Sequence, residues 1–135
     1  MRKFLAVIPC LVFILSCNRS DFNPELREIS TKPPSIKIIS PTIIPTLHPG
    51  EVLEVKAHLY DPDIIYVASW EAVRASVICG NNQYSQQFEP KQCHYDMDFK
   101  FYIPDHFAGD QVINIYGVDG LGNIATAQVH FKATN

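Results

Sequence analysis

The stretch His94-Tyr-Asp-Met-Asp-Phe-Lys-Phe-Tyr-Ile103 alternates apolar and polar side chains from end to end. A period of two residues places alternate side chains on opposite faces of a β-strand. Pro104 ends the run, because proline lacks the N–H group that a sheet ladder needs. This stretch predicts a strand with one face in a hydrophobic core and the other in water. The core face carries Tyr95, Met97, Phe99, Phe101 and Ile103.

The same period continues on both sides of this strand. It is regular in residues 51–60, 113–116 and 125–131, and Asp119-Gly-Leu-Gly-Asn123 between the last two is typical of a hairpin turn. Shorter strands are expected at 36–39, 64–70, 75–79 and 84–88. Seven or eight short strands without a convincing helix predict an all-β, antiparallel β-sandwich, with a small closed barrel as the alternative.

Several motifs resemble those of bacterial Ig-like modules of the fibronectin or cadherin type. They are Phe101-Tyr-Ile-Pro104, Gly109-Asp110, Ile113-Asn-Ile-Tyr-Gly-Val-Asp119 with Gly122-Asn123, and Pro34-Ser-Ile-Lys-Ile-Ile-Ser-Pro41. The resemblance spans residues 34–132 and implies an immunoglobulin-like sandwich in a cell-envelope lipoprotein, without an active site. The chain departs from antibody domains because Trp70 precedes both cysteines of the domain. The connection at 71–92 matches no functional motif.

The N-terminus has the layout of an export signal. Arg2 and Lys3 precede an apolar run at 4–15, which is too short for a bilayer core that needs about 20 residues. The boundary Ile14-Leu15-Ser16-Cys17 resembles a bacterial lipobox. This resemblance implies cleavage before Cys17, a diacylglycerol on its thiol and a fatty acid such as palmitate on its new amine. An uncleaved anchor and ordinary secretion are the alternatives.

The expected organisation therefore has three parts. Residues 1–16 form a lipoprotein signal peptide, 17–34 a lipidated N-terminus and linker, and 35–135 the Ig-like domain. The linker is polar and contains prolines, although 25–29 also suits a short helix packed on the domain. We expect the protein in the bacterial cell envelope, held by lipid at the outer membrane and facing the periplasm or the cell surface.

Charge narrows the range of partners. Loss of Arg2 and Lys3 with the signal moves the formal net charge from −3 to −5. An acidic chain without a basic run is a poor partner for nucleic acid or for direct contact with anionic lipid. The expected partners are the membrane, through the N-terminal lipid, and an envelope protein or a glycan.

The mature domain retains two cysteines, Cys79 and Cys93. In an exported protein this pair predicts a structural disulfide. The bridge would close a loop of about 15 residues and contribute about 3 kcal/mol through the chain entropy of the unfolded state. A redox or metal role is disfavoured because the spacing is not Cys-x-x-Cys.

Two groups of polar residues offer metal-binding chemistry. Asp61, Asp63 and Asp119 at strand ends are weak calcium candidates, but aspartates in such positions commonly cap turns. If the strands at 51–60 and 94–103 pair, four polar side chains share an outer face and form a conceivable zinc or proton-transfer cluster. They are His58, His94, Asp96 and Asp98. Solvent alone satisfies such side chains on an outward face, so we expect no metal and no cofactor.

Exposed aromatic residues give the best indication of a binding surface. The candidates are Tyr66, Trp70, Tyr84 and Tyr102, although large aromatics commonly fill the core instead. No Gly-x-Ser-x-Gly or His-Glu-x-x-His motif is present, so we expect no catalytic residue and no enzyme. The favoured function is a non-enzymatic, membrane-anchored interaction module. The alternatives are a glycan-binding module for surface nutrient capture, and an enzyme or inhibitor with its site at 71–92.

Overall fold

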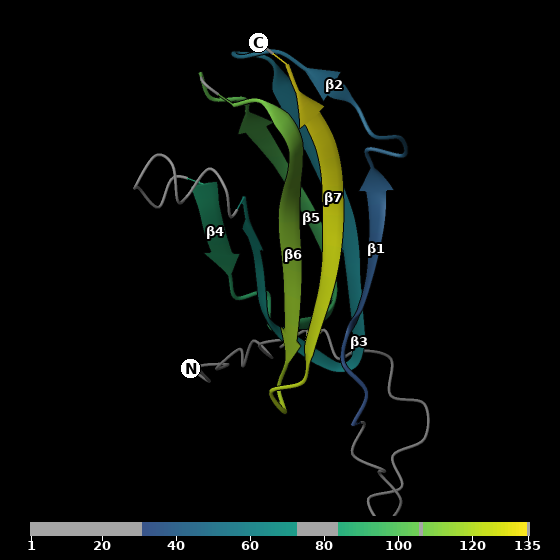
Figure 1. Cartoon of the computed structure of the whole chain (residues 1–135). Coiled ribbons are helices and arrows are strands. Elements are labelled where there is room, and N and C mark those ends of the chain that lie inside the picture. The colour runs from purple at the N-terminus through teal and green to yellow at the C-terminus, as the bar shows by residue number, and fades with distance from the viewer. Residues whose placement is uncertain (1–30, 73–83, 106, 135) are drawn as a thin grey trace, which may run out of the picture.

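The computed structural model describes residues 31–72, 84–105 and 107–134. Strands account for 70% of these residues, and none of them lies in an α-helix (Figure 1). The strands are β1 (Ser35–Ser40), β2 (Thr46–Leu47), β3 (Val52–Glu71), β4 (Ser85–Phe88), β5 (Gln92–Tyr102), β6 (Gly109–Asp119) and β7 (Ile124–Ala133). The predicted β-rich class is confirmed.

The longest strand, β3, replaces two strands that the sequence predicts as separate, at 51–60 and 64–70. Asp61 sits where the two would meet, and its Oδ1 accepts hydrogen bonds from the backbone N–H groups of Asp63 (2.7 Å) and Ile64 (3.3 Å). The pairing register of β3 with β5 shifts between Tyr60 and Ile65. The Asp-Pro-Asp segment therefore bends the strand without ending it.

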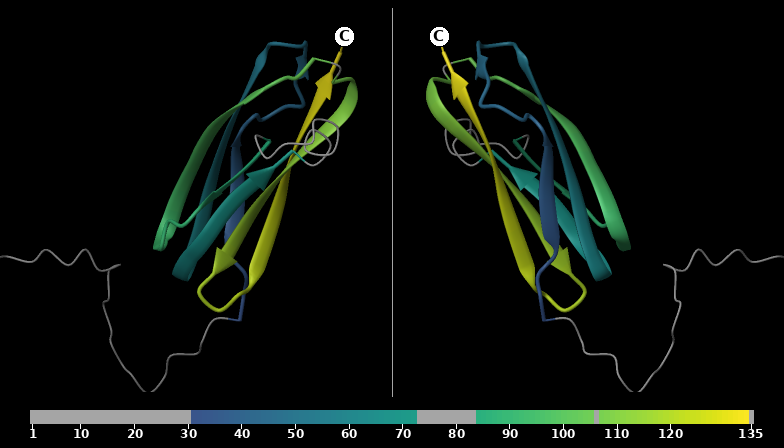
Figure 2. Two further views of the ribbon diagram at one scale, coloured as in Figure 1. Left: turned by 90° about the vertical axis from the view of Figure 1, so that its left-hand side faces the viewer. Right: turned by 90° about the vertical axis from the view of Figure 1, so that its right-hand side faces the viewer.

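The two halves of β3 have different neighbours. The half before the bend pairs with β1 on one side and β5 on the other, whereas the half after it pairs with β4 and β6. β6 continues the sheet to β7, and β7 to β2. All seven strands thus belong to one hydrogen-bonded sheet that curls into a half-barrel, with β5 and β7 on opposite sides in Figure 2.

One strand pair departs from the predicted antiparallel pattern. β2 runs parallel to β7, with Thr46 opposite Lys132 and Leu47 opposite Ala133, so the sheet is mixed. The expectation of a purely antiparallel sheet is wrong at this edge. A strand of two residues is too short to show a period, and the sequence therefore gave no sign of β2.

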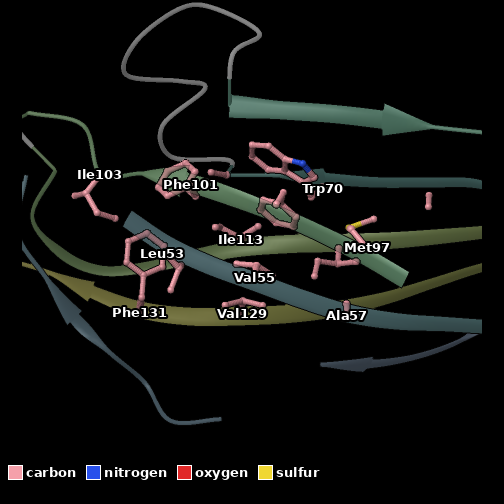
Figure 3. Packing of buried hydrophobic residues seen from close by; sticks show 14 of the residues in the cluster. Leu53, Val55, Ala57, Trp70, Met97, Phe101, Ile103, Ile113, Val129 and Phe131 are labelled. Atoms are coloured by element: carbon pink, nitrogen blue, oxygen red, sulfur yellow. The ribbon is translucent and has the colours of Figure 1, made fainter. Parts of the chain in front are cut away.

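The inner surface of the curled sheet holds the hydrophobic core (Figure 3). Alternate residues of β3, β5, β6 and β7 point into it, as the period of two predicts. Phe101 lies among four other rings, with centroid distances between 5.8 and 6.3 Å. The largest fully buried apolar side chains are Phe101, Phe131, Leu59, Ile65, Met97, Ile113, Ile115 and Val55.

The predicted hairpin between β6 and β7 is confirmed. Asp119 Oδ1 accepts hydrogen bonds from the backbone N–H groups of Leu121 (2.9 Å) and Asn123 (2.8 Å). Its Oδ2 accepts one from the Asn123 side-chain amide at 2.7 Å. Gly122 has φ of +86°, a left-handed conformation that side chains with a Cβ rarely adopt. The carboxylate and the glycine together define this turn.

The shorter predicted strands have mixed outcomes. The segment at 36–39 lies within β1 and that at 84–88 overlaps β4, while the strand at 94–103 begins two residues early as β5. The strand expected at 75–79 lies outside the described residues.

Candidate binding groove

The described surface is hollowed between β4 and the end of β5. This hollow, here called the edge groove, has a volume of about 450 Å³. Its lining comes from β3, the start of β4, the last residues of β5 and the segment that follows β5. The lining residues are Trp70, Tyr84, Gln86, Lys100, Phe101, Tyr102, Ile103 and Pro104.

Trp70 lies at the inner wall of the edge groove, between β4 and β5 in Figure 3. Its side chain is only 6% exposed and stacks on Phe99, with ring centroids 4.4 Å apart and an interplanar angle of 3°. The surface position considered for Trp70 is wrong, and the alternative, that this large aromatic fills the core, holds. The Trp70 ring belongs mainly to the core, and its buried Nε1 has no hydrogen-bond partner among the described residues.

The outer rim of the groove is polar and aromatic. Tyr102 is 63% exposed at the end of β5. Lys100 is exposed beside it, and its Nζ lies 3.4 Å from Glu54 Oε1. An ion pair between such exposed groups contributes little to stability, so Lys100 remains available to a ligand. The rim therefore combines a large aromatic surface with a positive charge.

The predicted aromatic residues are only partly gathered here. Trp70, Tyr84 and Tyr102 line the edge groove, but Tyr66 does not. The Tyr66 side chain is 49% exposed, and Lys91 Nζ lies 5.4 Å from the centroid of its ring. Three of the four candidates thus share one site, and Tyr66 is an isolated surface residue.

The groove lies away from the start of β1, where the linker expected at residues 17–34 would join the domain. Ser35, the first residue of β1, pairs with Tyr60 beside the bend of β3. The β6–β7 hairpin lies at the same end, because Gly120 donates a hydrogen bond to the Ile64 carbonyl at 3.2 Å. We call this the linker end. Tyr102 lies eight residues along β5 from His94, the partner of Tyr60, or roughly 26 Å at about 3.3 Å per residue.

The aspartates proposed for calcium form turns instead. Asp61 and Asp119 are both buried near the linker end, and each accepts backbone hydrogen bonds from its own turn. Asp61 Oδ2 is buried and has no hydrogen-bond partner in the described part of the chain. Among the described residues, no group of three or more His, Cys, Asp or Glu side chains is arranged to hold a metal ion.

Tyr95 and Asp119 have shifted pKa values, and neither residue lines the edge groove. Burial raises the pKa of the Tyr95 hydroxyl above its ordinary value of 10.0. Burial alone would also raise the pKa of Asp119. Hydrogen bonds from the Asn123 side chain and from the backbone of Asn123, Leu121 and Gly122 outweigh this effect. They lower the pKa of Asp119 below its ordinary value of 3.8.

The Asp119 hydrogen bonds predict acid-sensitive stability. Because its pKa is depressed in the folded state, this group stabilises the fold above its unfolded pKa of about 3.9. That contribution is lost as the pH falls through the lower, folded value. Asp119→Asn should lower the free energy of unfolding by about 1–3 kcal/mol at pH 7, and the difference from wild type should shrink at pH 3. Urea unfolding of both proteins at pH 3 and pH 7 measures this difference in the free energy of unfolding.

Asp98→Asn is the matched control for this prediction. Asp98 is exposed on β5 and its Oδ2 lies 3.4 Å from Lys56 Nζ, so its replacement should change stability little at either pH. An Asp119→Asn difference that is the same size at pH 3 and pH 7 would refute the charge-based explanation.

The histidine cluster that depended on pairing of the predicted strands is formed. β3 and β5 pair, with His58 opposite Asp96 and Tyr60 opposite His94. His58 Nδ1 lies 2.6 Å from Asp96 Oδ1. The fourth member, Asp98, pairs with Lys56 instead.

The predicted lipid and disulfide residues are only partly described. Cys17 and Cys79 lie outside the described residues. Cys93 is buried on β5, and its Sγ lies 3.9 Å from the Pro62 carbonyl oxygen. The disulfide between Cys79 and Cys93 stays a prediction.

Residues of the groove that the sequence did not single out include Gln86, Lys100 and Phe101. The alternation in 94–103 places Phe101 inward and its two neighbours outward, so each orientation was predictable. The closeness of β4 to the end of β5 was not predictable, because both strands reach this site through their pairing with β3.

No protein-family model matches the chain, and a search of curated proteins gave no significant match. Over the residues that the structure describes, no helix is long and apolar enough to cross a membrane. Assignment of a function therefore depends on the sequence signals and on the site itself.

Proposed function

We propose that the chain is a lipid-anchored, non-enzymatic Ig-like module of the bacterial cell envelope that binds a protein partner through the edge groove. The observation that carries the proposal is the position of the groove, which lies roughly 26 Å along β5 from the linker end. A domain tethered at its linker end presents such a groove away from the membrane.

The strand pairing supports an Ig-like sandwich. One layer would comprise β1, the first half of β3, and β5. The other would comprise β4, the second half of β3, β6, β7 and β2. Their inner faces enclose one shared core, which is the organisation expected of two packed sheets.

The anchor rests on the N-terminal sequence. The lipobox-like boundary at Cys17 implies three acyl chains, and each buried methylene contributes about 0.8 kcal/mol to membrane binding. Residues 18–34 would then link the lipid to β1. This arrangement suits a module that meets partners at a fixed distance from the outer membrane.

An extended polypeptide segment is the ligand that best fits the groove. Among the described strands, β5 pairs with β3 alone, so we expect its other edge to accept a further strand. Such an edge can bind an added strand through backbone hydrogen bonds. Tyr102 would supply an aromatic anchor at the rim, and Lys100 would favour a carboxylate on the partner.

A glycan ligand is less well supported. Stacking of a sugar ring needs an exposed aromatic face, but Trp70 is buried and one face of its ring is covered by Phe99. Tyr102 is the groove residue that could offer such a face. The glycan-binding module therefore remains the alternative, with saccharide binding as the result that would favour it.

Quantitative affinity capture tests the proposal. The full-length protein is expressed in its envelope, crosslinked and isolated, and co-purifying proteins are quantified for wild type and for Tyr102→Ala. Loss of a buried aromatic anchor in an interface typically costs about 2 kcal/mol or more, which corresponds to roughly 30-fold in affinity. We expect a discrete partner that Tyr102→Ala depletes at least 10-fold.

Tyr66→Ala is the matched control, because Tyr66 is an exposed tyrosine outside the groove. It should retain the partner at the wild-type level. The groove would not be the binding site if both variants lose the partner equally, or if neither variant loses it.

A further inference from the structure

The outer face of β3 and β5 brings two histidine rings together near the linker end. His94 Nδ1 lies 3.4 Å from His58 Nε2, and the ring centroids are 5.5 Å apart. The Tyr60 ring packs against His94 with a centroid distance of 4.6 Å, which restricts the orientation of that imidazole. Two ring nitrogens from neighbouring strands thus lie next to each other.

Asp96 determines which nitrogen of His58 is free. A carboxylate oxygen only accepts hydrogen bonds, so the 2.6 Å contact with Asp96 Oδ1 requires a proton on His58 Nδ1. In the neutral ring, His58 Nε2 then carries a lone pair directed at His94. Histidines that bind metals commonly donate their other N–H group to a carboxylate in this way.

The separation of the two nitrogens suits a shared metal ion. At 3.4 Å, His94 Nδ1–H donates a long hydrogen bond to His58 Nε2, and a metal ion bound between the two nitrogens would replace that proton. Two nitrogen ligands of a tetrahedral Zn²⁺, each about 2.0–2.1 Å from the metal, lie about 3.3–3.4 Å apart. Imidazole ligands favour Zn²⁺, Cu²⁺ and Ni²⁺ over Ca²⁺ and Mg²⁺.

The surrounding charges are balanced. Lys37 on β1 lies opposite His58, on the side away from Asp96. Lys56 is paired with Asp98, whose Oδ2 lies 3.4 Å from its Nζ. Asp96 thus offsets the charge of Lys37, as Asp98 offsets that of Lys56.

We propose that His58 Nε2 and His94 Nδ1 bind a divalent transition metal ion of the zinc class, with Asp96 orienting His58. Water fills the remaining coordination positions. The described residues supply two direct ligands, which agrees with the lack of any group of three potential ligands. The site lies near the linker end and is separate from the edge groove, so this proposal does not depend on the proposed function.

Isothermal titration of the tag-free, full-length protein in detergent with Zn²⁺ tests the site. We expect one ion per chain. Asp96→Asn should weaken binding by about 10-fold or more, as loss of an orienting partner does. His94→Gln removes a direct ligand and should weaken binding further. His130→Gln, at an exposed histidine on β7, is the control and should leave affinity unchanged.

The ¹⁵N chemical shifts of the imidazoles provide a second measurement on the wild-type protein alone. Zn²⁺ should shift His58 Nε2 and His94 Nδ1, while His58 Nδ1 keeps its proton. The proposal is overturned if Zn²⁺ does not bind, if His130→Gln weakens binding as much as His94→Gln, or if the shifts occur in the rings of other histidines instead of His58 and His94.

Discussion

Phe101→Ala is expected to lower the free energy of unfolding by about 3–5 kcal/mol, the usual cost of removing a large aromatic from a core. Phe101 is 2% exposed, and its ring contacts those of Trp70, Tyr84, Phe107 and Phe131. Trp70 lies on β3 and Phe131 on β7, while Tyr84 precedes β4 and Phe107 precedes β6, so the cavity would weaken contacts between separate parts of the core. Domains of this kind are stable by only about 5–15 kcal/mol. Urea unfolding followed by circular dichroism measures the loss.

Tyr102→Ala is the matched control, because Tyr102 is the next residue of the same strand and is 63% exposed on the opposite face. Its replacement should change stability by less than about 0.5 kcal/mol. Similar losses for the two variants would contradict the burial pattern of β5.

Cys17→Ser is expected to move the protein from the membrane fraction to the soluble fraction. In the proposed anchor the Cys17 thiol is the attachment point for diacylglycerol, and serine offers no thiol. Loss of the lipid chains would remove most of the membrane affinity, because binding strength grows with every buried methylene. Fractionation followed by intact-mass analysis measures both the location and the lipid.

Cys10→Ala is the control for this variant, because Cys10 lies in the apolar part of the signal and alanine preserves that character. The control should remain membrane-bound and carry the same lipid mass. The proposed lipid anchor would be refuted if the Cys17→Ser protein stays in the membrane fraction and the wild-type protein carries no lipid.

The orientation of side chains along the regular strands follows directly from the sequence. In 94–103 the alternation places Phe101 in the core and Tyr102 in water, and β5 has this arrangement. An uninterrupted period of two over ten residues fixes both faces at once, because every residue supports the same register. The Asp119 hairpin was equally predictable, since its glycine and its capping carboxylate act locally.

The orientation of Trp70 could not be predicted from local alternation. The register between β3 and β6 shifts between Ile65 and Val67, so one residue is inserted into the strand at Tyr66. An inserted residue reverses the faces of everything beyond it. Ile65 is therefore buried before the shift, and Ala68 and Trp70 are buried after it. The inward position of Trp70 depends on this irregularity, which no local period reveals.

The edge groove depends on a still longer-range feature. Its walls come from residues near 70, 85 and 101, which meet because one bent strand pairs with β4 beyond the bend and with β5 before it. The sequence marked Asp61-Pro62-Asp63 as the end of a strand. Continuation of β3 through that segment is what brings the two edges together.

In-cell photocrosslinking tests the central claim most directly, that the tethered domain binds a protein partner through the edge groove. A photoreactive amino acid replaces Tyr102 at the groove rim or, as the control, Tyr66 outside it, with Cys17 intact in both proteins. We predict a discrete protein adduct in the membrane fraction from position 102 and none of the same mass from position 66. The same adduct from both positions, or no protein adduct from position 102, would contradict the claim.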